Sequence, residues 1–463
     1  MNRLTRTLLS LTLLTAAHPA ARADILSDHP GIWLGDMKIP NGPTLKIGAE
    51  LFTRADGTPW ASIAVASQGN FDIPVTALRE TGDVLHLDFA GAGLDLTWRG
   101  DRFDGVFQEV GGPKLSFPLT RVDTFARKAA PQTPKPPFPY RDEQLAVRST
   151  DGVTLGATLS IPAGVAHPNA VILVHGSGPS TRDADGRFAV LADALARQGI
   201  AVLRFDKRGV ARSTGSYDKH TLAQLAADVH AAVDAVRARH QFNRVGLVGH
   251  SEGPGIAAAV AARYPKSVDF IVSLAGVGLK GIDMMLLQDR ATATANGASP
   301  EQAEVLVRYA RSYYQTVVAN PDAAQRIAAL NALDAARSPT DTALADKFKM
   351  RGGSLSVDNG FAGKDFLRAT LVADTPSDWR GVKCPVLALN GSVDSQVPVE
   401  SLAGIVSSLK AGGNRRVESA VLPSLNHLFQ TAVTGAESEY AGIEEILAPV
   451  AIERVAAFVK KQR

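Results

Sequence analysis

The pentapeptide GHSEG at residues 249–253 gives one serine a clear chemical context. A G-x-S-x-G pattern between a strand and a helix predicts a tight turn that projects the hydroxyl of Ser251 above a sheet. An apolar run at 245–249 precedes the serine, and an Ala-rich, helix-forming segment at 255–264 follows it. The N-terminus of that helix would favour the negative charge that develops during acyl transfer. We therefore predict that Ser251 is a nucleophile, the alternative being an ordinary glycine-rich turn.

A nucleophilic serine needs a base, and histidine is the usual one. A serine on such a turn takes first an acid and then a histidine from later in the chain. Of the ten histidines only His427 follows Ser251, in the loop after the apolar run 417–422. That loop would place the imidazole at the carboxyl edge of the sheet. His427 is therefore the predicted base, and a surface-loop histidine is the alternative.

The carboxylate that orients this imidazole and stabilises its charged form is predicted to be Asp394. It comes directly after the predicted strand 386–389, in the run LNGSVD. Its rivals are Asp283 and Asp289, near the end of the preceding strand, and Glu400, which is expected within a helix.

Two backbone N–H groups are needed to stabilise the oxyanion of the tetrahedral intermediate. Glu252, directly after the nucleophile, is predicted to supply one, and Ser177 in the glycine loop HGSG at 175–178 the other. His175 in this turn is expected to hydrogen-bond the backbone and to transfer no proton. The run DKRG at 206–209 is interpreted as an ion-pair network that fixes a loop, with substrate contact as the weaker alternative.

The segments that position these residues alternate between strands and helices after residue 141. Short apolar runs predict buried strands, and longer segments with an apolar stripe predict helices. Strands are predicted at 171–174, 200–205, 245–249, 270–274, 386–389 and 417–422, and helices at 188–198, 221–239 and 255–264. This alternation predicts an α/β fold with a doubly wound, mostly parallel sheet.

Residues 278–380 interrupt the alternation. The run SPEQ at 299–302 is a capping box with proline at the first helical position, so a helix is predicted there, and a second one at 322–336. An insertion of this kind before a strand predicts a helical cap over the strand ends. Several of its side chains either line a substrate pocket or only pack the cap: Met284, Met285, Leu306, Tyr309, Tyr313 and Tyr314.

Residues 24–125 follow a different pattern. Apolar and polar residues alternate with period two, and glycine-rich turns separate the alternating runs, which include 85–89, 94–99 and 115–119. This pattern predicts a small antiparallel β domain. Residues 126–140 contain five prolines and predict an extended linker, so the α/β domain is expected to cover 141–463.

Residues 1–23 predict a signal peptide. They have a basic start with Arg3 and Arg6, continue with an apolar run from Leu8 to Ala17, and end in the small-residue spacing of Ala21 and Ala23. The apolar run has only ten residues, whereas about 20 are needed to span a bilayer. We therefore expect cleavage after Ala23 and a protein that is exported to the periplasm or secreted. No stable membrane span is expected in the remainder.

The charge balance argues against a polyanionic partner. The 463 residues carry 49 basic and 46 acidic side chains, but all three excess arginines lie within the predicted signal peptide. A balanced chain offers no electrostatic case for nucleic acid or an anionic membrane. The sequence contains no Cys/His cluster with metal-ligand spacing and no phosphate-binding loop, so no metal or cofactor is expected. The pattern leaves the oligomeric state open.

Several of these motifs together resemble a bacterial α/β-hydrolase family of serine aminopeptidase-like or carboxylesterase-type enzymes. The resemblance spans about 141–463 and rests on HGSGPSTRD, RFDKRGVARSTG, GHSEG, LNGSVDSQVP and LNHLF. It implies an α/β-hydrolase fold with a helical cap and a triad of Ser251, His427 and Asp394. The run GIWLG at 31–35 is similar to the β-rich domain that precedes some exported members. Pro254 departs from the family pattern, in which a second glycine often follows GHSEG.

The sequence favours an ester as the bond cleaved, because a bare triad suffices for simple esters. Thioester cleavage or acyl transfer is the second hypothesis. Peptide cleavage is the third, since no acidic cluster is evident for a substrate amino terminus. A different class also stays open, a ligand-binding protein with a vestigial hydrolase fold. In every case the expected partner is a small molecule, an acyl compound for the enzyme hypotheses.

Overall fold

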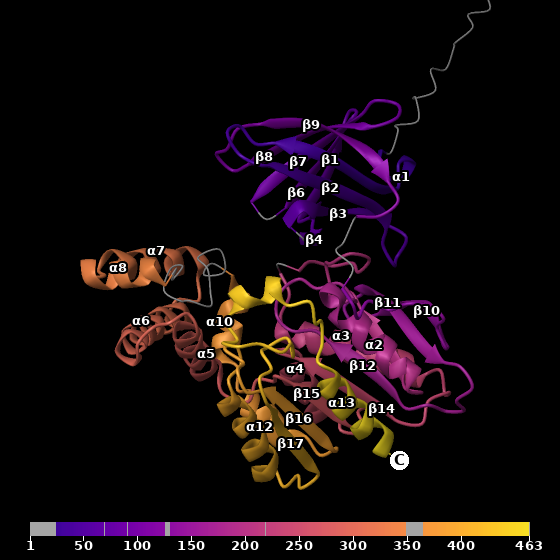
Figure 1. The fold of residues 1–463 in the computed structure, drawn as a ribbon, viewed down its shortest axis with the longest axis vertical. Helices are drawn as coiled ribbons and strands as arrows, with labels where there is room; N and C mark the ends of the chain where they lie inside the picture. The colour runs from indigo at the N-terminus through magenta and orange to yellow at the C-terminus, as the bar shows by residue number, and fades with distance from the viewer. Residues whose placement is uncertain are drawn as a thin grey trace, which may run out of the picture.

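The structure is a computed structural model that describes residues 25–68, 70–89, 91–125, 130–217, 219–348 and 364–462. The predicted signal peptide, residues 1–23, lies outside the described residues. Figure 1 shows an antiparallel β domain at the N-terminal end of the chain and a larger domain of strands and helices after it.

The N-terminal domain is a nine-stranded antiparallel sheet with the order β4-β3-β2-β1-β9-β8-β7-β6-β5. Its first and last strands pair with each other, so the meander returns to its starting point. A short helix α1 (Ile25–Asp28) precedes the strands, which are β1 (Gly31–Lys38), β2 (Thr44–Thr53), β3 (Pro59–Val65), β4 (Asn70–Pro74), β5 (Ala77–Thr81), β6 (Val84–Phe89), β7 (Ala92–Trp98), β8 (Phe103–Glu109) and β9 (Leu115–Val122).

The period-two pattern buries one face of this sheet. Leu85 and Leu87 on β6 are fully buried, while His86 between them is partly exposed. Trp33 belongs to an aromatic cluster in this core, where its ring packs edge-on against Trp98 and Phe103. The alternation in the sequence therefore describes a folded β domain with its own core.

The proline-rich segment packs on the larger domain from residue 130 onward. The side chain of Gln132 accepts hydrogen bonds from the N–H groups of Ile446 and Leu447 at 2.6 and 3.0 Å. Arg197 donates to the carbonyls of Lys135 and Pro137 at 2.7 and 3.0 Å. This part of the linker is therefore docked by side-chain contacts that its own composition does not indicate.

The larger domain contains an eight-stranded sheet with the order β10-β11-β13-β12-β14-β15-β16-β17. In this order the strands after β11, which are β12 to β17, all run parallel to one another. β10 and β11 are antiparallel additions at one edge. The strands are β10 (Tyr140–Arg148), β11 (Thr154–Pro162), β12 (Ala170–Val174), β13 (Ala201–Phe205), β14 (Val245–His250), β15 (Ile271–Leu274), β16 (Val386–Gly391) and β17 (Val417–Leu422). The predicted doubly wound, mostly parallel sheet is confirmed.

Helices cover both faces of this sheet, as Figure 1 shows. One face carries α2 (Arg187–Arg197) and α13 (Pro449–Lys461), and the other carries α3 (Leu222–Arg237), α4 (Gly253–Arg263), α11 (Thr375–Gly381) and α12 (Val399–Ala411). Two apolar cores result, one on each side of the strands. Short apolar strands between two such layers are what the sequence pattern predicts.

The insertion forms a helical cap with its own core. Its helices are α5 (Gly281–Ala295), α6 (Pro300–Ala319), α7 (Ala323–Ala335), α8 (Pro339–Lys347) and α10 (Asp365–Val372). The capping box predicted at Ser299 is present at the start of α6. The predicted insertion also included α11, but Trp379 of that helix is fully buried in the core against α4 and α12. The cap therefore ends before α11.

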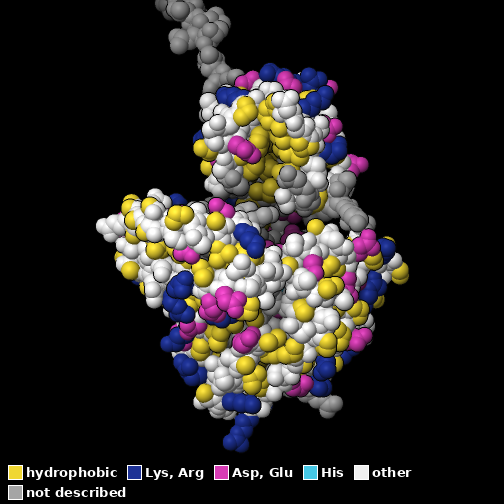
Figure 2. Space-filling view, turned by 60° about the vertical axis from the view of Figure 1, so that its left-hand side comes forward, with side chains coloured by type: hydrophobic (Ala, Val, Ile, Leu, Met, Phe, Trp, Pro, Cys, Tyr) yellow, Lys and Arg dark blue, Asp and Glu magenta, His cyan; other side chains and the backbone are white. Residues whose placement is uncertain are grey.

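Among the described helices, none is both long and apolar enough to cross a bilayer. Figure 2 shows lysine and arginine interspersed with aspartate and glutamate over the visible face. This view shows no broad field of one sign, in agreement with the balanced charge of the sequence.

Candidate active site

Ser251 lies at the sharp turn between β14 and α4. Its φ of 62° is in the left-handed region, and its N–H donates to the Leu274 carbonyl at 2.9 Å on the next strand. The turn requires a glycine after it, because a Cβ at Gly253 would lie 2.2 Å from the Val174 carbonyl oxygen. Pro254 occupies the first turn of α4, where a missing N–H is tolerated. The chain thus forms the strained turn that GHSEG predicts.

The three side chains predicted to act together meet at the carboxyl edge of the sheet. Oγ of Ser251 lies 3.0 Å from Nε2 of His427, and Nδ1 of His427 lies 3.0 Å from Oδ2 of Asp394. His427 is 2% exposed and Asp394 5%. With its proton on Nδ1, the imidazole donates to the carboxylate and accepts from the serine hydroxyl. This is the hydrogen-bond chain that an activated serine requires.

Asp394 is held by the turn that follows β16. Its Oδ1 accepts the N–H groups of Gln396 and Val397 at 2.9 and 2.8 Å, which leaves Oδ2 for the imidazole. The rival carboxylates lie elsewhere. Asp289 is buried in the cap, where the Tyr314 hydroxyl donates to it at 2.7 Å. Asp283 lies on α5 and Glu400 in the first turn of α12.

His250, the residue before the nucleophile, contacts the loop that carries the base. Its Nε2–H donates to the backbone carbonyl of His427 at 2.8 Å. The neighbouring Asn426 closes the same loop, because its Oδ1 accepts the N–H groups of Leu428 and Gln430. Burial, with a smaller contribution from His427, holds the pKa of His250 well below its usual value. Nothing in the GHSEG motif indicates this contact of His250, which lies 177 residues away in the chain.

The glycine loop after β12 lies directly against the nucleophile. A Cβ at Gly176 would be 2.9 Å from Cβ of Ser251, so only glycine allows this approach. The predicted second oxyanion donor, Ser177, follows it and lines the same cavity as Ser251. His175 donates through Nε2 to the Thr181 carbonyl at 3.0 Å. This is the backbone contact expected of it.

Lys207 reaches the glycine loop from the end of β13. Its Nζ donates to the carbonyls of Gly176 and Gly178 at 2.9 and 3.1 Å, and it lies 3.8 Å from Oε2 of Glu252. Lys207 is 3% exposed. Burial lowers the pKa of Lys207 and raises that of Glu252, while the charge of each opposes the other's shift.

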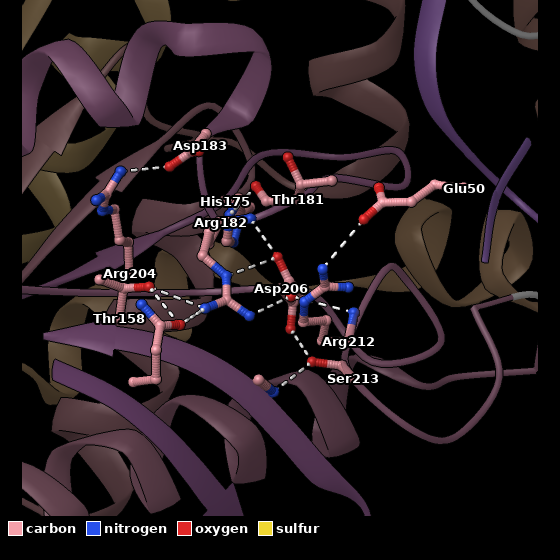
Figure 3. A network of polar contacts seen from close by, with 12 residues as sticks. Glu50, Thr158, His175, Thr181, Arg182, Asp183, Arg204, Asp206, Arg212 and Ser213 are labelled. Carbon is pink, nitrogen blue, oxygen red and sulfur yellow. Dashed lines mark hydrogen bonds and ion pairs between the residues drawn. The ribbon is translucent and has the colours of Figure 1, made fainter. Parts of the chain in front are cut away.

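The rest of the DKRG run forms an ion-pair network, which Figure 3 shows around Asp206. Arg182 donates to both carboxylate oxygens of Asp206, through Nη2 of its side chain at 2.6 Å and through its backbone N–H at 2.7 Å. Arg212 also donates its N–H to Asp206, and its guanidinium pairs with Glu50 of the β domain at 3.1 Å. Arg208 pairs separately with Asp228 at 2.7 Å. The sequence indicated the network but not its link to the β domain.

A cavity of about 420 Å³ opens beside Ser251, between the sheet edge and the cap. Its walls are mainly apolar and come from α4, α5, α10 and α11. The apolar lining includes Leu222, Ile256, Val277, Met284, Met285, Phe366, Leu367 and Val397. Two acidic residues, Glu252 and Asp378 on α11, also line it, and burial beside Asp374 raises the pKa of Asp378.

Some of the cap side chains singled out in the sequence line the cavity, and others only pack the cap. Met284 and Met285 on α5 line the cavity. Tyr313 and Tyr314 on α6 are buried in the core of the cap, together with Leu306. Because α6 packs behind α5, its aromatic residues support the wall of the cavity without forming it.

Within the described ranges, no group of three or more His, Cys, Asp or Glu side chains is placed to hold a metal ion. Cys384 is partly buried just before β16, and burial raises the pKa of its thiol to about 12. A thiol held protonated in this way is a poor nucleophile and a poor metal ligand.

The sheet order and the strained serine turn define the larger domain as an α/β-hydrolase. Within that class, residues 166–326 match the family model described as serine aminopeptidase, S33. The matched segment contains the glycine loop, Lys207 and the nucleophile turn, while Asp394 and His427 lie beyond it.

One curated relative is the esterase EstD of Thermotoga maritima, with 29% identity over 143 residues. The match covers 30% of this chain and about a third (33%) of that esterase. Solved structures with a similar fold include Est1E of Butyrivibrio proteoclasticus with ferulic acid bound, which is 17% identical with a TM-score of 0.43. That match covers 69% of this chain and 98% of Est1E. A proline iminopeptidase of Mycobacterium smegmatis has the same identity, coverage and score.

Proposed function

We propose that this protein is a serine hydrolase that cleaves carboxylic esters. The observation that carries the proposal is the unbroken chain from Ser251 through His427 to Asp394, with both links at 3.0 Å. The strained turn adds support, since it costs stability and places the hydroxyl where a substrate can reach it.

The reaction follows from the positions of these atoms. Oγ of Ser251 attacks the acyl carbon while Nε2 of His427 takes its proton, and Asp394 stabilises the resulting imidazolium. The N–H groups of Ser177 and Glu252 are the proposed donors to the oxyanion. Collapse of the tetrahedral intermediate expels the alcohol, which receives the proton from His427. Water then releases the acid from the acyl-enzyme by the same steps.

The mainly apolar cavity supports an ester with an apolar acyl or alcohol group as the substrate. EstD, whose name describes an esterase, supports the same bond type, although the match spans a minor part of both chains. The partner is accordingly a small molecule.

An active-site probe and a substrate panel test this function. A fluorophosphonate should label the purified protein at Ser251 and leave Ser251→Ala unlabelled. p-Nitrophenyl esters, acyl-CoAs and aminoacyl anilides should then be compared by kcat/KM, with esters expected to be fastest. Faster turnover of acyl-CoAs or of anilides would replace the ester by a thioester or a peptide bond. A protein that neither labels nor turns over any member would instead be a binding protein.

We also propose that the protein is exported to the periplasm or secreted, on the pattern of residues 1–23. Cell fractionation of the native host should find the protein outside the cytoplasm. N-terminal sequencing of that material should begin at Asp24. A cytoplasmic protein that retains Met1 would contradict export.

A further inference from the structure

The peptide unit between Gly176 and Ser177 has two polar ends with different surroundings. Its carbonyl oxygen accepts the Nζ of Lys207 at 2.9 Å. Its N–H belongs to Ser177, which lines the cavity beside Ser251, and this N–H has no backbone acceptor among the described residues. The carbonyl and the N–H of a trans peptide point in opposite directions in one plane. A group that fixes the direction of the Gly176 carbonyl therefore also fixes the direction of the Ser177 N–H.

Lys207 holds this peptide firmly because it is buried and makes two bonds to the same loop. A second bond runs to the Gly178 carbonyl at 3.1 Å. The loop needs such a restraint, since glycines flank Ser177 on both sides and glycine permits backbone rotations that other residues resist. A hydrogen bond from a cation also polarises the peptide and strengthens its N–H as a donor.

The same ammonium group lies 3.8 Å from the carboxylate of Glu252. The backbone N–H of Glu252 is the other proposed oxyanion donor. One buried cation thus contacts the two segments that would form the oxyanion hole, on either side of the nucleophile.

We propose that Lys207 is the positioning residue of the oxyanion hole. By binding the Gly176 carbonyl, it aims the Ser177 N–H at the oxyanion of the tetrahedral intermediate that is bonded to Ser251. This inference rests on the proposed hydrolase function. The ammonium need not touch the substrate, because it acts through the peptide plane that it anchors.

Lys207→Met tests the proposal, because it keeps the length of the side chain and removes the donor. Loss of one oxyanion donor lowers kcat by about 10²–10³-fold, and we expect an effect near the lower value with little change in KM. Lys207→Gln, which keeps a shorter polar donor, should retain more activity than Lys207→Met. It also serves as the test if the methionine variant does not fold.

The decisive comparison uses a p-nitrophenyl ester and the matching thionoester. The thionoester replaces the oxyanion by a sulfur anion, a larger atom and a weaker hydrogen-bond acceptor. The wild-type protein should strongly prefer the ester, and Lys207→Met should reduce that preference by about tenfold or more, because the ester alone loses the oxyanion contact.

Arg208→Lys is the matched control. Arg208 is the next residue, is equally buried and pairs with Asp228, and in the described part of the chain none of its hydrogen bonds or ion pairs reaches the glycine loop. This variant should lower the melting temperature and leave the ester-to-thionoester ratio unchanged. If a Lys207 variant slows both substrates equally, its role is merely structural and the proposal is wrong. A wild-type protein inactive on every ester would instead overturn the proposed function itself.

Discussion

At the scale of single residues, the strongest expectation is that the triad acts as one unit. Ser251→Ala and His427→Ala should each lower kcat by up to about a million-fold, and the double variant should be little worse. Asp394→Asn should cost about ten-thousand-fold, because an amide donates to Nδ1 and imposes the wrong tautomer on His427. Steady-state kinetics on a p-nitrophenyl ester measure all four variants. Near-normal turnover by Asp394→Asn would remove that residue from the proposed role.

The sequence predicted these three residues because each follows an apolar run that forms a strand. Strands β14, β16 and β17 are parallel, so their carboxyl ends share one edge, and chain order then selects the histidine. The contacts of Lys207 could not be predicted in this way. Its acceptors are backbone carbonyls about 30 residues earlier in the chain, and no side-chain pattern marks a backbone acceptor. The sequence indicated only that its run fixes a loop.

At the scale of elements, the glycine loop makes folding stability depend on pH. Burial, and to a lesser extent the charge of Lys207, lower the pKa of His175 to about 3. In the unfolded chain a histidine titrates near ~6.5, so between these values the unfolded state binds a proton that the folded state refuses. Stability is therefore fully present above about pH 6.5 and is lost as the pH falls toward 3.

The variant His175→Gln removes this titrating group. On the acid side, it should reduce the slope of the free energy of unfolding against pH by up to about 1.4 kcal/mol per pH unit, which is the contribution of one proton. Urea unfolding at several pH values between 4 and 8 measures the slope. An unchanged slope would show that His175 does not contribute to the acid sensitivity.

The cap separates residues that form the cavity wall from residues that support it. Met285 lines the cavity, so Met285→Ala should shift the preferred acyl chain with a modest change in melting temperature. Tyr313 is 2% exposed in the cap core, so Tyr313→Ala should lower stability by about 3–5 kcal/mol, as large-to-small changes at buried aromatic positions do. Rates on p-nitrophenyl esters of increasing chain length, with thermal melts, distinguish the two. Proportional losses over all chain lengths in Met285→Ala would assign it to packing.

The helix α6 itself was predictable, because a capping box and a proline mark its start. The elements that pack against α6 could not be predicted. A stripe of apolar residues says that one face is buried, but not whether the burial is against a substrate cavity or another helix. The same limit applies to α11, whose tryptophan packs into the core of the sheet domain.

At the scale of the whole molecule, the β domain touches the hydrolase domain at a loop near the proposed oxyanion hole. Glu50 pairs with Arg212 at 3.1 Å, the Arg212 guanidinium lies 4.7 Å from the ring centre of Phe52, and the N–H of Ala55 donates to the Arg212 carbonyl at 2.8 Å. Figure 3 shows the pair with Glu50 beside the network around Asp206. These few contacts join two domains with separate apolar cores.

A chain that begins at Ala130 should therefore fold without the β domain and hydrolyse a small ester within about tenfold of the full-length rate. The loop keeps the bonds from Arg182 to Asp206 and from Lys207 to the glycine loop, and loses only the outer contacts of Arg212. A chain that begins at Arg141 should melt at a lower temperature, because it also loses the bonds of Gln132 and the docked prolines. Circular dichroism, thermal melts and ester kinetics on both chains make the comparison. If the Ala130 chain is folded but inactive, the β domain completes the site through Arg212, and the two domains form one catalytic unit.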